Sequence, residues 1–150
     1  MVTLQVKRPV RLPVDKSILV NAAQVTLELK SAKSTSDVGL VVGNDTLLQT
    51  LNLKYRGVNS ATDVLSFPAG EKDPDTSDLY LGDVVISLPR AQAQAASEGH
   101  PLVDELQLLV VHGVLHLLGY DHLKVSDKKQ MQAAQDKILS TLGVDLVVTL

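Results

Sequence analysis

Three of the four histidines in this 150-residue chain lie within residues 112–122, which read HGVLHLLGYDH. His112 and His116 are four residues apart, so on a helix they would stack on one face. Gly119 would end that helix and bring His122 round toward the other two rings. Three neutral imidazoles with one open position form the ligand set of a catalytic zinc ion. The spacing therefore predicts one Zn²⁺ held by His112, His116 and His122.

A simpler interpretation is that these are core and turn histidines bonded to backbone carbonyls, which would be favoured for a single histidine. Three at this spacing on an apolar segment favour the metal. Imidazole also suits nickel, copper or iron, and the ligand type alone does not separate these ions from zinc. The fourth histidine, His100, precedes Pro101 at a helix start, and we expect it to be a surface or cap residue.

The spacing also resembles that of the metzincin peptidases, H-E-x-x-H-x-x-G-x-x-H, but Gly113 replaces their glutamate. Peptide hydrolysis needs a base for the water and an acid for the amine, so the glycine removes the usual proton acceptor. Phosphodiester cleavage depends less on one carboxylate, because a metal and a cation can stabilise the charges that develop. Gly113 therefore favours a phosphodiester substrate over a peptide.

Arg56 is the candidate for that cation. It lies beside Gly57 at a predicted helix end, from which a guanidinium could bind phosphate oxygens in bidentate fashion. It could instead be a cation favoured there by the helix dipole. Asp83 and Asp121 could act as a base or orient a ligand, although each could also orient another neighbour or cap a turn.

The elements that position these residues follow from hydrophobic periodicity. Strands are predicted at residues 2–7, 38–43, 63–68 and 81–87, with an acidic loop at 69–80. Helices are predicted at 16–30, at 44–57 with Tyr55 facing inward, at 87–98, from Pro101 to Leu118, and at 126–143 with Ser126 as its cap. The fold class is α+β (an α/β layer): residues 1–150 form a single domain with a mixed four-stranded sheet and five or six helices. The central buried helix carries the metal ligands.

Composition limits the function further. The sequence lacks cysteine, which excludes disulfides and thiolate ligands. Its start resembles no signal peptide and no apolar run approaches the roughly 20 residues of a membrane span, so we expect a cytoplasmic protein without a membrane partner.

The net charge is −3, but it is unevenly distributed along the chain. Residues 1–60 hold eight Lys and Arg against four Asp and Glu, whereas residues 61–150 hold six against thirteen. A cationic face could therefore contact a polyanion, although an ordinary mixed surface is an equal alternative. The residues of that face would be Lys7, Arg8, Arg11, Lys16, Lys54 and Arg56.

Four blocks, LNLKYRG, TDVLSFP, LGDVVIS and HGVLHLLGYDH, resemble in order and spacing the YbeY family of bacterial metal-dependent endoribonucleases. The resemblance covers roughly residues 38–142. It implies a ribonuclease specific for single strands that acts in ribosomal RNA maturation, notably at the 3′ end of 16S rRNA, and in ribosome quality control. It also implies zinc ligands at His112, His116 and His122 and a functional arginine at Arg56.

The implied partners are single-stranded RNA, ribosomal RNA, a small-subunit ribosomal protein and a ribosome-assembly GTPase, and no DNA partner is expected. Two alternatives stay open. The histidine spacing allows a metallopeptidase-like zinc hydrolase, and the cationic half allows a non-catalytic assembly factor with a structural zinc. A fourth protein ligand would favour the structural zinc, and an exchangeable water would favour the enzyme.

Overall fold

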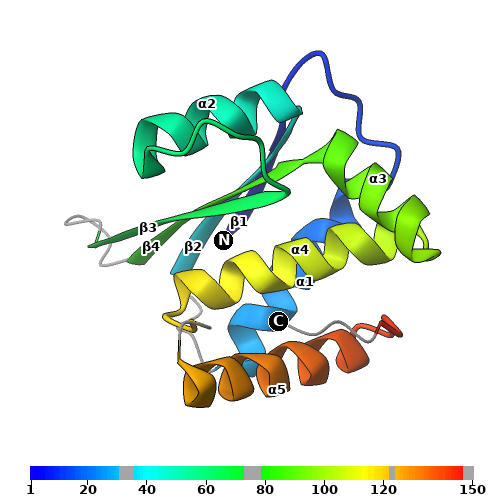
Figure 1. The fold of residues 1–150 in the computed structure, drawn as a ribbon. Helices are drawn as coiled ribbons and strands as arrows, with labels where there is room; N and C mark the ends of the chain where they lie inside the picture. The colour runs from blue at the N-terminus through cyan, green and yellow to red at the C-terminus, as the bar shows by residue number, and fades with distance from the viewer. Residues whose placement is uncertain (31–35, 73–78, 122–123, 147–150) are drawn as a thin grey trace.

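A mixed sheet forms the centre of the fold (Figure 1). The computed structural model describes residues 1–30, 36–72, 79–121 and 124–146. Within them the strand order is β1-β2-β4-β3. The strands β1 (Val2–Val6), β2 (Ser36–Gly43) and β4 (Leu79–Ser87) run parallel, and the edge strand β3 (Val64–Lys72) runs antiparallel to β4. The predicted mixed four-stranded sheet is therefore confirmed.

Helices cover both faces of this sheet. The described part of the chain contains five: α1 (Lys16–Leu29), α2 (Asp45–Arg56), α3 (Leu88–Glu98), α4 (Leu102–Leu117) and α5 (Val125–Thr141). Figure 1 shows α2 on one face, with α1, α4 and α5 on the other. The predicted α+β class is confirmed. None of the helices in the described residues is long and apolar enough to cross a membrane.

Local signals in the sequence explain most helix ends. The side chain of Asn44 accepts a hydrogen bond from the Leu47 N–H at 3.0 Å and caps α2, which ends where Gly57 adopts a φ of 71°.

Two details of the helix prediction are wrong. Tyr55 does not face inward but is 60% exposed, and α5 begins at Val125, so Ser126 lies in its first turn rather than at its cap.

Helix α4 is the central buried helix that the sequence predicts. It is buried on nearly every side, between the sheet and the helices α1 and α5. Its contact with β4 is very close, because a Cβ at Gly113 would lie 2.5 Å from Cγ1 of Val84. Only glycine fits at this crossing unless the helix moves away from the sheet.

The loop predicted at 69–80 is shorter in the structure, because β3 continues to Lys72 and β4 begins at Leu79. Residues 73–78 lie outside the described part of the chain. The longer strands extend the hairpin that forms one edge of the sheet.

The predicted cationic residues lie on different elements of the fold, with Lys16 at the start of α1. Lys7, Arg8 and Arg11 follow the carboxyl end of β1, the same end of the parallel strands at which α2 begins. Helix α2 then runs back along the sheet for twelve residues, a distance of about 18 Å at 1.5 Å per residue. Figure 1 shows α2 running toward the other end of the sheet, and Lys54 and Arg56 lie in the last turn of this helix.

Candidate metal centre

A cleft of about 610 Å³ lies where the end of α2, the first half of β3 and the last turns of α4 meet. Arg56, His112 and His116 all line it, so the structure brings three of the four predicted site residues together. The fourth, His122, lies outside the described residues. Asp63, Ser66, Tyr120 and Asp121 also contribute to the walls.

The two histidines of α4 face each other across one turn of the helix. Their Nε2 atoms are 3.2 Å apart, and the rings meet edge to face at 76° with centroids 4.7 Å apart. Two nitrogens that each bind zinc at about 2.0–2.1 Å in tetrahedral geometry lie about 3.3 Å from one another. The observed separation therefore fits a shared tetrahedral ion, and the donor set, imidazole nitrogen, is one that zinc accepts.

The other ring nitrogen of His112 is held from a different helix. Its Nδ1 lies 3.0 Å from Oε1 of Gln135, a fully buried residue of α5. Because an amide oxygen only accepts hydrogen bonds, this contact requires a proton on Nδ1 and leaves the lone pair on Nε2. The sequence reasoning missed Gln135, and residues 112–122 contain no signal that points to it.

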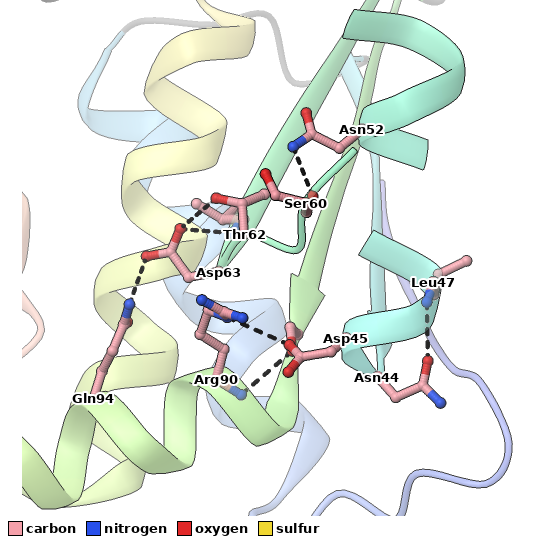
Figure 2. A network of polar contacts seen from close by, with 11 residues as sticks. Asn44, Asp45, Leu47, Asn52, Ser60, Thr62, Asp63, Arg90 and Gln94 are labelled. Atoms are coloured by element: carbon pink, nitrogen blue, oxygen red, sulfur yellow. Dashed lines mark hydrogen bonds and ion pairs between the residues drawn. The ribbon is translucent and has the colours of Figure 1, made fainter. Parts of the chain in front are cut away.

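Arg56 ends α2 and is exposed at the mouth of the cleft. Polar contacts tie the segment that follows it to α2 and to α3 (Figure 2). Asn52 donates from Nδ2 to the Ser60 carbonyl at 2.9 Å, and Asp63 accepts from Gln94 Nε2 at 3.3 Å and from the Val64 N–H at 2.8 Å. This network holds the segment between α2 and β3 and positions the cleft wall at Asp63.

The two carboxylates considered from the sequence lie in different places. Asp121 lines the cleft. Asp83 does not, because its neighbour Val84 packs against Gly113 of α4 and successive side chains of a strand point to opposite faces. On its own face Asp83 accepts a hydrogen bond from the hydroxyl of Tyr80, and burial together with this carboxylate raises the pKa of Tyr80 to about 12. The hypothesis that Asp83 serves the histidine site is wrong.

Gly113 occupies the position at which metzincin peptidases carry their base. A side chain there would meet Val84 at once and would come within 3.3 Å of Ser66 Oγ, which itself donates to the Gly113 carbonyl at 3.0 Å. A glutamate at this position would therefore separate α4 from the sheet. The packing supports the interpretation that this chain does not use the peptidase base.

His100 is not a surface or cap residue as predicted. Its Nε2 lies 2.6 Å from Oε2 of Glu105, and the two side chains are only 14% and 6% exposed. Pro101 occupies the N-cap position of α4, without a side-chain cap. His100 and Glu105 thus form a nearly buried pair at the opposite end of α4 from the cleft.

The fold and the site define an α+β protein with paired helix histidines in an arginine-lined cleft. The profile of the family described as Endoribonuclease YbeY matches residues 5–143. Endoribonuclease YbeY of Roseiflexus sp. (strain RS-1) is 42% identical over 149 residues, covering 95% of this chain and 93% of that protein. The protein of the same name from Desulforamulus reducens is 43% identical over 129 residues, covering 83% and 84%. The chain belongs to the YbeY endoribonuclease family.

A solved structure agrees with this assignment. The solution structure of TM1509 from Thermotoga maritima matches with a TM-score of 0.63 and 26% sequence identity. The match covers 95% of this chain and 89% of that one. The two proteins therefore share the arrangement of sheet and helices over nearly their whole lengths.

Proposed function

We propose that this chain is a zinc-dependent endoribonuclease that cleaves single-stranded RNA during ribosomal RNA maturation. The observation that carries the proposal is the pair of imidazole nitrogens 3.2 Å apart in a cleft that Arg56 also lines. The relatives support it, because they are named endoribonucleases and are about 40% identical over most of the chain. As a member of this family acting on ribosomal RNA, the protein would work in the cytoplasm.

His112, His116 and His122 would hold the ion. A zinc ion held by three histidines lowers the pKa of a bound water toward about 7 and polarises a phosphoryl oxygen. His112 and His116 supply two imidazole nitrogens at a suitable separation. Arg56 donates paired N–H groups to the non-bridging phosphate oxygens and stabilises the negative charge that grows on them during cleavage.

The cleft suits a flexible strand. Its volume of about 610 Å³ lies in the range that holds one drug-sized ligand, which corresponds to one or two nucleotides. In a duplex the bases are paired and stacked, so a nucleotide would first have to leave the helix to enter the cleft. Specificity for single-stranded RNA follows from this cost.

The direct test compares three substrates with purified protein, either stripped of metal or reconstituted with zinc. We expect cleavage of a labelled single-stranded RNA by the zinc form alone, with the same RNA in a duplex and casein left intact. Cleavage of casein would support a metallopeptidase instead. Tight zinc binding without cleavage of any substrate would support the assembly factor with a structural zinc.

The assignment to ribosomal RNA needs a test in cells. Replacing the chromosomal copy with the Arg56→Glu variant should cause accumulation of 16S rRNA precursors extended at the 3′ end, detected by mapping RNA ends. Small-subunit proteins and the assembly GTPase would then be examined as partners by their co-purification with the protein on these precursors. Normal 3′ ends in the variant strain would contradict the assigned substrate.

A further inference from the structure

Helix α5 places one polar side chain within its apolar face. Gln135 is 0% exposed. The other buried residues of the helix are Met131, Ala134, Ile138 and Leu139. The spacing of these residues is that of a helix stripe packed on a core, and α5 packs against α4. A polar group at the centre of such a stripe lowers stability unless its hydrogen bonds are made.

The hydrogen bonds of Gln135 are only partly made. Its Oε1 pairs with Nδ1 of His112 at 3.0 Å, whereas its buried Nε2 has no hydrogen-bond partner among the residues that the structure describes. An unpaired buried amide group lowers the stability of the fold, and an apolar residue of similar size would avoid this loss. Packing alone therefore does not explain a glutamine at position 135. The hydrogen bond that its Oε1 accepts from His112 explains it.

We propose that Gln135 is a positioning residue for the candidate metal centre, acting through His112. By accepting the Nδ1 proton, it fixes the tautomer in which the Nε2 lone pair faces His116, 3.2 Å away. The other tautomer would place a proton on Nε2, between the two rings, and would block a shared cation. This inference rests on the proposed function, because only a bound metal ion gives the Nε2 lone pair of His112 a ligand role.

The choice of an amide also has a consequence for the substrate. Glutamine orients the ring without adding charge, whereas a carboxylate at the same position would place a negative charge behind a ligand of the ion. The positive charge of the site is then preserved for the phosphate of the substrate. Gln135 thus serves a site that attracts an anion.

The first test reads the tautomer of His112 without zinc or RNA. Long-range ¹H–¹⁵N correlation spectra of metal-free, ¹⁵N-histidine protein are recorded at about pH 8, above the ordinary histidine pKa of about 6.5. Wild type should show the proton of His112 on Nδ1, and Gln135→Met should lose this preference. Gln130→Met, a matched change at an exposed position of α5, should resemble wild type.

The second test measures the zinc dissociation constant by competition with a chromophoric chelator. Gln135→Met should weaken zinc binding about 10- to 100-fold, as loss of such a supporting partner does elsewhere. Gln135→Glu retains the acceptor and should keep or tighten the wild-type affinity. Gln130→Met should leave it unchanged.

Three outcomes would overturn the proposal. They are a wild-type His112 protonated on Nε2, a Gln135→Met variant with wild-type tautomer and zinc affinity, and equal weakening by Gln135→Met and Gln135→Glu. The wild-type spectrum decides even if the methionine variant fails to fold. The tautomer measurement uses neither zinc nor RNA. A failure of the proposed nuclease activity can therefore be told apart from a failure of the role proposed for Gln135.

Discussion

The two ends of helix α4 place histidines in opposite situations. At its start, His100 lies 2.6 Å from Glu105, and both side chains are nearly buried. Near its end, His112 and His116 direct Nε2 atoms at each other, 3.2 Å apart, on the wall of a cleft. The first pair joins a base to an acid and is complete within the protein. The second joins two bases and lies where a ligand can reach it.

A structural histidine and a functional histidine thus lie at the two ends of the same helix. The residues at both ends are histidines of similar burial, so neither residue type nor burial distinguishes a structural histidine from a functional one. The chemical nature of the partner and access to the cleft decide, because two imidazole nitrogens share only one proton or one cation.

The largest effect is expected from His116→Ala. Removing a metal ligand should abolish stoichiometric zinc binding, and loss of the several kcal/mol that a metal supplies should slow RNA cleavage by about 1,000-fold or more. Metal analysis and a single-stranded RNA assay measure both. His100→Phe is the control at the other end of the helix and should retain zinc and activity. Equal losses in the two variants would remove the contrast between the ends of α4.

Arg56→Glu should slow RNA cleavage by about 100- to 1,000-fold, the usual result of removing one group that stabilises transition-state charge. Zinc content should stay at the wild-type value. The unfolding midpoint should fall only slightly, because Arg56 is exposed but a negative charge in the last turn of α2 interacts unfavourably with the helix dipole. Lys54→Glu makes the same charge change on a neighbouring exposed residue that does not line this cleft. If both variants lose activity equally, the effect is general electrostatics and not a role of Arg56.

His100→Phe should lower the free energy of unfolding by about 1–3 kcal/mol, because it leaves the Glu105 carboxyl buried without its partner. Urea denaturation measures this loss. Replacing both partners, as in His100→Phe with Glu105→Leu, should recover much of it. A double variant no more stable than the single one would show that the pair is not self-contained.

The smallest effect is expected from Gly113→Ala. The added methyl would overlap Val84, at a cost of about 1–3 kcal/mol, but alanine also favours a helix by about 1 kcal/mol, so the net loss should be about 1 kcal/mol. Val84→Ala should relieve the overlap, giving a favourable coupling of about 0.5 kcal/mol or more in a double-mutant cycle. Additive effects would mean that the two residues do not limit the approach of α4 to the sheet.

The sequence was sufficient for local structure. Alternating apolar residues located β1, and Asn44 and Gly57 marked the ends of α2, because these signals act over a few residues. The i, i+4 spacing likewise placed His112 and His116 on one helix face. Arg56 lies in the same cleft as His112 and His116, because the end of α2 and the glycine that follows fix the position of this residue.

Features that depend on tertiary register were not accessible from the sequence. Asp83 belongs to the other face of the sheet because Val84, one residue on, meets α4. The sequence places Glu105 in the first turn of α4, but it does not show that this carboxyl contacts His100. Gln135 lies 23 residues after His112 on a different helix, and only the packing of α5 on α4 brings the two together.

X-ray absorption at the zinc edge of the reconstituted protein would show whether the end of α4 holds an open zinc site. The expected spectrum shows one zinc with three imidazole nitrogens at about 2.0–2.1 Å and one exchangeable oxygen ligand. His116→Ala should lose this signature. Four protein ligands around the ion, or a zinc without histidine scattering, would mean that the end of α4 does not hold an open zinc site.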